Sequence, residues 1–142
     1  MFELSTEAAR LAGILMIAIV TIESGGWYLT RIARGAKPAT PFQQSFARAG
    51  HGHAGMLVTL GLVGAILTDA TTLDGIAAWV ARSGIPLAAI LMPAGFFFSS
   101  MGAGRTTANR FIWLVWIGAL SLAAGAVTLG IGLLTQRGGG QL

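Results

Sequence analysis

The chain has 142 residues, of which 54% are hydrophobic and only 10% are charged, and its net charge is +4. Soluble domains carry about 25% charged residues, so this composition excludes a soluble globular protein. The sequence contains no cysteine, which excludes disulfides, iron–sulfur clusters and thiolate zinc sites. At this length we predict one domain, residues 1–142, built into a membrane.

Four apolar windows predict transmembrane helices at residues 11–30, 49–68, 83–104 and 111–136. A membrane-spanning helix needs roughly 20 mostly apolar residues, because the hydrocarbon core is about 30 Å thick. The windows are continuously apolar rather than alternating, so the fold class is predicted to be all-α, a four-helix bundle and not a β-barrel. The first window is interpreted as a retained helix, because it contains Glu23 and no small-x-small cleavage site precedes Trp27.

The positions of Lys and Arg predict the orientation in the membrane. Six lie in the loops after the first and third windows: Arg31, Arg34, Lys37, Arg48, Arg105 and Arg110. Three lie on the other side: Arg10, Arg82 and Arg137. Because an excess of Lys and Arg marks the cytoplasmic face, we expect a multi-pass protein of the inner (plasma) membrane with loops one and three in the cytoplasm. No basic patch interleaved with aromatics is present, so we expect no nucleic-acid partner.

Lines of small residues indicate close helix packing. The fourth window carries small residues at alternating spacings of three and four: Gly118, Ser121, Gly125, Thr128 and Gly132. The second window has Gly61 and Ala65, four residues apart. Such lines let helix backbones approach within lipid, although they do not say whether the partner helix belongs to the same chain or to another copy. Aromatic residues near the positive side are typical of an interfacial belt: Trp27, Tyr28, Trp113 and Trp116.

Both histidines, His51 and His53, lie among small residues at the start of the second window. An ionisable group in a membrane span is a functional-site hypothesis by default, although a histidine can also bridge helices or lie among headgroups. On a regular helix the two side chains point about 200° apart, so they cannot chelate one ion unless Gly50 and Gly52 allow the stretch to unwind. Copper or zinc would lack further ligands. A haem with one axial histidine needs only one protein ligand, which is fewer than the other sites considered.

Two further polar or aromatic features allow more than one interpretation. Glu23 is expected to pair with Arg31 or Arg48, or to hydrogen-bond a histidine, although a proton path through Glu23 and the histidines is a further hypothesis. The three consecutive aromatics at 96–98 follow Pro93 in the third window, which permits a kink. They favour either lipid-facing packing or an aromatic wall for a flat cofactor or substrate.

Short motifs in a common order resemble one known family. They are Gly-Ile-Leu-Met-Ile at 13–17 with Trp27 at the end of the first window, Ala-Arg-Ala at 47–49 before the histidines, and Gly-Phe-Phe at 95–97. Together they resemble the small four-helix membrane isomerases typified by styrene oxide isomerase, with hydroxylaminobenzene mutase as a more distant relative. The resemblance implies a trimer that binds haem b between subunits and opens an aryl epoxide to an aldehyde, with ferric iron as the Lewis acid.

The resemblance also assigns roles to individual residues. His51 takes the position of the axial ligand, and His53 is the second choice. Leu57 and Phe97 fall where the family has a catalytic-site asparagine and tyrosine, so both polar groups are replaced by apolar side chains here.

We therefore expect an integral membrane isomerase that uses iron as a Lewis acid on a small apolar substrate from the bilayer. Arg48, Gly55 and Met56 are expected beside the haem, and Phe96, Phe97, Met56 and Leu57 beside the substrate. The alternative from another class is a non-catalytic accessory subunit of a larger membrane complex, which the small-residue lines and the shortage of polar groups also favour.

Overall fold

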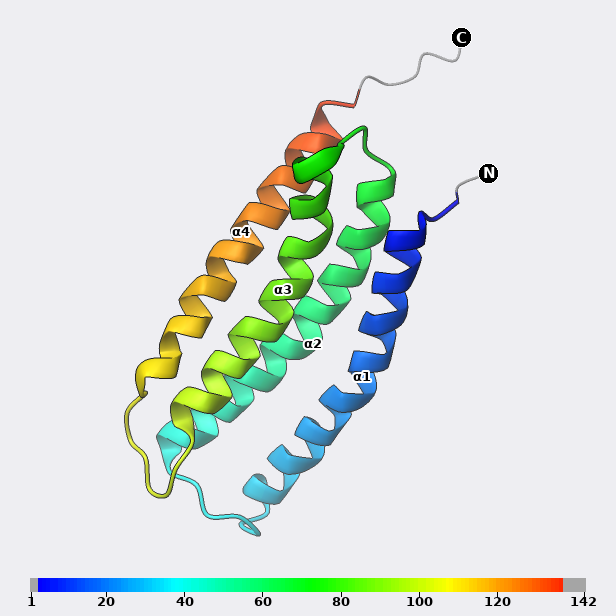
Figure 1. The fold of residues 1–142 in the computed structure, drawn as a ribbon. Helices are drawn as coiled ribbons and strands as arrows, with labels where there is room; N and C mark the ends of the chain where they lie inside the picture. The colour runs from blue at the N-terminus through cyan, green and yellow to red at the C-terminus, as the bar shows by residue number, and fades with distance from the viewer. Residues whose placement is uncertain (1–2, 137–142) are drawn as a thin grey trace.

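The computed structural model describes residues 3–136, and these residues form an antiparallel bundle of long helices (Figure 1). The helices are α1 (Thr6–Ala33), α2 (Pro41–Asp69), α3 (Gly75–Ser100) and α4 (Trp113–Leu134), and a short 3₁₀ turn, η1 (Arg110–Ile112), leads into α4. All four are long and apolar enough to cross a membrane. The predicted all-α class and membrane character are confirmed. Arg137, which the orientation prediction used, lies outside the described residues.

The helices extend beyond most of the apolar windows, because capping groups and not hydropathy end a helix. α2 begins at Pro41, eight residues before its window, where the Thr40 side chain accepts a hydrogen bond from the Gln43 amide and Gln43 bonds back to Thr40. The third window, in contrast, extends past the end of its helix: α3 ends at Ser100, so the window 83–104 was wrong over its last four residues. Gly102 and Gly104 there adopt positive φ angles, which the helix does not permit.

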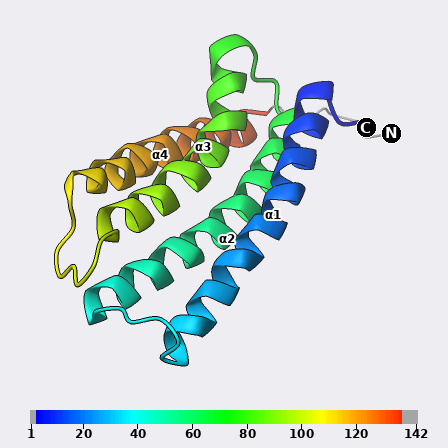
Figure 2. The same ribbon diagram turned by 60° about the horizontal axis from the view of Figure 1, so that its bottom comes forward.

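α3 lies in the middle of the bundle and α1 at its edge. Figure 2 shows α3 and α4 side by side, with α2 and α1 forming a second pair. α1 packs chiefly on α2, and residues of α1, α2 and α3 build the hydrophobic core. The buried members of that core are Leu15, Leu57, Val58, Ala88, Ala89 and Met92. Because α1 has one main neighbour, it is free to diverge from α3 along part of its length.

Glycines set the contact between α3 and α4. A Cβ atom on Gly84 would lie 2.7 Å from the Cα of Gly125, closer than real Cβ contacts allow. Beside this contact the Ser121 hydroxyl donates a hydrogen bond to the carbonyl of Gly84 at 2.8 Å. Gly118 is packed in the same way against Met92. The small-residue line of α4 is thus confirmed as a packing surface within the same chain: Gly118, Ser121 and Gly125 meet α3, and Gly132 meets Leu73 in the loop before α3.

At the opposite end from the loops that follow α1 and α3, the Asp69 carboxylate joins three helices. It accepts hydrogen bonds from the backbone amide and the hydroxyl of Ser5 at 2.6 and 2.9 Å, and it forms a 2.6 Å ion pair with Arg82. Ser5 caps α1, Asp69 ends α2 and Arg82 lies in α3. This cluster therefore holds α1 against the bundle at one end only.

We predict that Gly84→Ala lowers the free energy of unfolding by about 1–3 kcal/mol, the usual cost of overpacking a close contact. Gly130→Ala in α4 is the matched control, since a Cβ there would meet nothing within 4 Å. Unfolding in detergent micelles with added sodium dodecyl sulfate measures both variants. Equal stability of the two variants would contradict the packing described for Gly84.

Candidate functional site

The histidine segment is regular α-helix, and its two imidazoles face different neighbours. The ring of His51 lies against α1, where a Cβ on Gly25 would be 3.2 Å from Nδ1 and one on Gly26 would be 3.6 Å from Nε2. The ring of His53 lies 5.0 Å from that of Phe96 on α3. The helix does not unwind at the glycines, so the two histidines do not meet at one ion. Within residues 3–136 no three His, Cys, Asp or Glu side chains gather as a metal site.

His51 has two ring nitrogens without a protein partner. Neither forms a hydrogen bond with any residue in the described part of the chain, so His51 does not bridge two helices by hydrogen bonding. Neither nitrogen is among the buried atoms without a partner, so the ring reaches the molecular surface. The imidazole is therefore accessible to a ligand that enters beside it.

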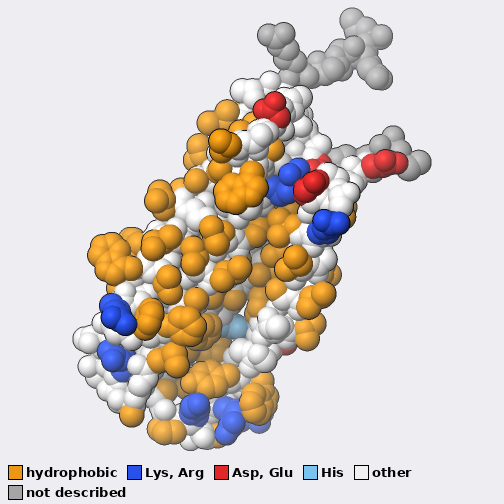
Figure 3. Space-filling model, in the orientation of Figure 1, with side chains coloured by type: hydrophobic (Ala, Val, Ile, Leu, Met, Phe, Trp, Pro, Cys, Tyr) orange, Lys and Arg blue, Asp and Glu red, His pale blue; other side chains and the backbone are white. Residues whose placement is uncertain are grey.

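An open cavity of about 830 Å³ lies between α1, α2 and α3, and His51 is not among the residues that line it. Its volume falls in the range of about 300–1,000 Å³ that is usual for ligand sites. The lining includes Gly25, which touches the His51 ring, and Ala47, which precedes His51 by one turn of α2. Figure 3 shows an imidazole at the bottom of the hollow between helices. The residues that line the cavity are Ser24, Gly25, Tyr28, Ile32, Lys37, Pro38, Ala39, Thr40, Gln43, Ala47, Phe97, Ser100, Met101, Gly102, Ala103 and Gly104.

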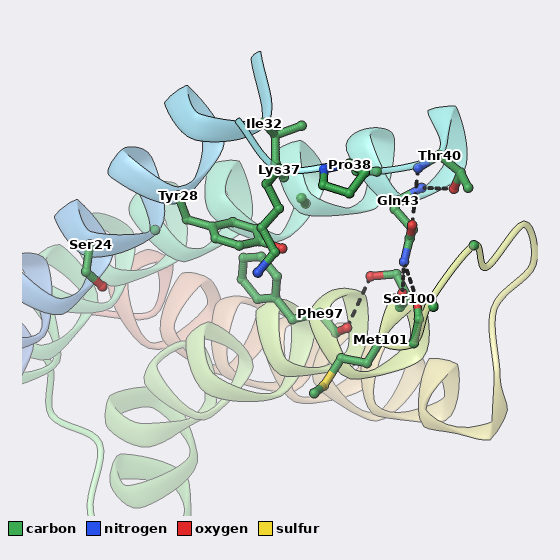
Figure 4. A pocket seen from close by; sticks show the side chains of 16 residues that line it. Ser24, Tyr28, Ile32, Lys37, Pro38, Thr40, Gln43, Phe97, Ser100 and Met101 are labelled. Atoms are coloured by element: carbon green, nitrogen blue, oxygen red, sulfur yellow. Dashed lines mark hydrogen bonds between the residues drawn. The ribbon is translucent and has the colours of Figure 1, made fainter. Parts of the chain in front are cut away.

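The cavity has aromatic walls and a polar mouth. The rings of Tyr28 and Phe97 face it from α1 and α3 (Figure 4). At the mouth, the ammonium of Lys37 lies 4.8 Å from the centroid of the Tyr28 ring. The Gln43 amide donates hydrogen bonds to the carbonyls of Ser100 and Gly102 at 3.0 and 2.7 Å, which ties the start of α2 to the end of α3. The mouth therefore offers one cation in front of an aromatic interior.

Gly50 seats Phe97 beside the cavity. A Cβ on Gly50 would lie 3.0 Å from the Phe97 ring and 3.2 Å from the Cβ of Phe96, so a side chain there would have to displace the Phe97 ring or α3 by a few tenths of an ångström. Phe98, by contrast, is exposed and contacts Phe111 edge-on. Of the three consecutive aromatics, two thus face α2 and one faces outward.

Of the predicted site residues, the structure places Phe97 in the lining of the cavity. His51 does not line the cavity itself but touches Gly25, which does, and the other predicted site residues lie elsewhere. Leu57 is fully buried in the hydrophobic core, and Met56 is 58% exposed on the outside of α2. Neither lines the cavity. Gly55 has open space in front of it.

Arg48 lines a separate shallow hollow of about 260 Å³ with Leu29 and Thr30 of α1. It therefore lies near the cavity without lining it.

Sequence reasoning missed Tyr28, Lys37 and Gln43 as site residues. Tyr28 was predicted as part of an interfacial belt, and Lys37 was counted only as a loop charge. The signal for Gln43 was the Thr40-x-x-Gln43 spacing, which is typical of a capping box at the start of a helix. In the structure this capping box lies at the mouth of the cavity. For Tyr28, the signal was its place one turn after the Gly25-Gly26 pair.

Glu23 lacks the partner predicted for it. It is exposed on α1, and no hydrogen bond or ion pair joins it to another residue between 3 and 136. Arg31 lies instead over the ring of Trp27, 5.1 Å from its centroid. Within one copy, the structure therefore does not show the predicted pair of Glu23 with Arg31, Arg48 or a histidine.

Comparison with known proteins adds no relative: no family model and no curated protein matches the sequence, and no solved structure matches the fold.

We predict that Gly50→Ala destabilises the protein by about 1–3 kcal/mol, because the added methyl group displaces the Phe97 ring. Gly52→Ala, two residues away and open to the surroundings, is expected to leave stability unchanged or slightly raised. Thermal unfolding of the detergent-solubilised variants tests the pair. A stable Gly50→Ala protein would mean that α2 and α3 do not approach at this glycine.

Proposed function

We propose that this chain is an integral membrane isomerase that binds haem b through His51 and acts on a small apolar substrate such as an aryl epoxide. The observation that carries the proposal is an imidazole without a hydrogen-bonding partner beside an aromatic-walled cavity within the bundle. The short motifs that resemble the styrene oxide isomerase family favour the same reaction class.

Three features near the cavity would suit a haem held by His51: the ring nitrogens of His51 without a hydrogen bond, aromatic side chains in the lining and a cation at the mouth. Because His51 touches the lining residue Gly25 and does not line the cavity itself, the haem would have to reach the imidazole past Gly25. Both ring nitrogens of His51 lie against α1, Nδ1 beside Gly25 and Nε2 beside Gly26, and one of them would hold the iron. Tyr28 and Phe97 offer aromatic faces to a flat macrocycle, and Lys37 at the mouth offers a cation to its anionic groups. Gly25 and Gly26 keep α1 free of side chains where it covers the ring.

When bound, the ferric haem supplies a Lewis acid that polarises the oxygen of the substrate. The chain itself would position the substrate. Phe97 holds the aromatic ring of the substrate by stacking, and no carboxylate lines the cavity to activate a water molecule for hydrolysis. Tyr28, whose phenol is the only one in the sequence, supplies the hydroxyl donor that Leu57 and Phe97 cannot supply.

We further propose that the loops at 34–40 and 101–109 lie in the cytoplasm of a cell whose inner membrane holds the protein as a homotrimer. In support, Lys and Arg side chains gather at the end of the bundle where both loops lie (Figure 3). A positive end of this kind is typical of the cytoplasmic side. The trimer comes from the family resemblance.

The proposal predicts a haem absorption band in protein purified in detergent from haem-supplied cells. His51→Ala is expected to abolish the band, because it removes the axial ligand. His53→Ala and Phe97→Ala are expected to retain it, since the first lies on the α3 side of α2 and the second removes a wall and not a ligand.

Colourless wild-type protein would overturn the proposal. If that protein also co-purified with larger membrane subunits, an accessory role would replace the enzymatic one. A band that His51→Ala retains and His53→Ala loses would move the ligand to His53.

A further inference from the structure

The carboxyl group of Glu23 and the Nε2 atom of His53 are two polar groups within membrane-spanning helices that have no partner among the described residues of one copy. Glu23 is exposed on α1 and is bonded to none of the described residues. His53 uses Nδ1 for a 2.8 Å hydrogen bond to the carbonyl of Ala49, while its Nε2 has no partner and reaches the surface. A charged side chain at the centre of a span costs about 2.5 kcal/mol or more, so a lipid-facing carboxylate needs a partner.

The two groups lie at the same depth in the bundle. The contact of His51 with Gly25 and Gly26 fixes the register of α1 against α2, which run antiparallel (Figure 1). From His51 to His53 the chain of α2 rises about 3 Å, at about 1.5 Å per residue. From Gly25 back to Glu23 the chain of α1 moves about 3 Å in the same direction. Glu23 and His53 are therefore level with each other.

One copy does not bring these groups together, because they belong to different faces. His53 lies on the side of α2 that meets Phe96 of α3, about 200° around the helix from the side that meets α1. A second copy of the chain can bring its Glu23 to this His53 at the matching depth. Arg48 is a poorer match, because it lies about 7.5 Å nearer the loop end than His53 does.

We propose that Glu23 of one copy pairs with His53 of the next copy across a ring-closing interface. Because Nδ1–H of neutral His53 donates to Ala49, Nε2 is left as an acceptor for the protonated Glu23 carboxyl group. With the proton on Nε2 instead, the imidazolium donates to the carboxylate. In both arrangements neither group faces lipid alone. Two different surfaces meet in this contact, and such a contact gives a ring of copies when the rotation between neighbouring copies closes.

The surfaces around the two groups are apolar, as a contact between copies in lipid requires. Ile17 and Val20, on α1 near Glu23, are each 71% exposed. Met56 and Leu60, on α2 beyond His53, are 58% and 41% exposed. The proposed pair would thus be framed by aliphatic side chains that exclude water and strengthen its hydrogen bond. This inference does not depend on haem binding.

Cysteine cross-linking tests the pair cleanly, because the chain contains no cysteine. Two differently tagged copies are co-expressed, one carrying Glu23→Cys and the other His53→Cys, and their membranes are oxidised. We expect a shift to a dimer band that carries both tags. Ile14→Cys with His53→Cys is the matched control, since Ile14 is 64% exposed on the same helix but lies about 13.5 Å deeper, and this combination is expected to give no band.

The proposal would be overturned if Glu23→Cys and His53→Cys copies gave no cross-linked dimer, or if the dominant dimer joined two Glu23→Cys copies.

A second measurement without cysteine variants guards against misfolding of those variants. Glu23→Gln can still donate to Nε2, whereas Glu23→Leu cannot. The oligomer mass in detergent should therefore match wild type for Glu23→Gln and fall towards the monomer for Glu23→Leu. Equal masses for all three proteins would also overturn the pairing.

Discussion

Close approach through glycine is the constraint on which this structure depends. In lipid, helices gain little from burying apolar side chains, so they associate where small residues let backbones come near. Gly84 and Gly125 hold α3 on α4, and Gly50 holds α3 on α2. Gly25 and Gly26 hold α1 on the ring of His51. The glycines thus decide which helix faces meet, and the aliphatic residues fill the space around those contacts.

The cavity follows from the uneven distribution of these contacts. α3 has close neighbours on two sides, whereas α1 rests chiefly on α2 and is tied by Asp69 at one end. Towards the other end α1 diverges from α3, and the space between them remains open. The imidazole of His51 touches Gly25, one of the residues that line this space. A polar ring beside an aromatic-walled cavity within a membrane span has the elements of a cofactor site, which is why the proposed function is placed there.

The sequence predicted the bundle well because hydropathy and small-residue spacing report directly on spans and contacts. It predicted the start of α2 and the end of α3 poorly. Hydropathy does not report the Thr40 cap that begins α2, nor the positive φ angles of Gly102 and Gly104 that follow the end of α3. The separate directions of His51 and His53 followed from helical geometry alone.

The lining of the cavity was less accessible to sequence reasoning. Tyr28 and Phe97 meet there only because α1 and α3 diverge, and that depends on packing between distant residues. The predicted partner of Glu23 is not found within one copy for a related reason: the closeness of charged residues in the sequence does not show on which side of α1 the Glu23 side chain lies.

The central claim is that His51 holds a ferric haem as its only protein ligand, and electron paramagnetic resonance of the haem-loaded protein tests it most directly. A single axial imidazole with an open sixth position predicts a high-spin ferric signal that disappears in His51→Ala. A low-spin signal typical of two nitrogen ligands, or a spectrum that His51→Ala leaves unchanged, would contradict the claim.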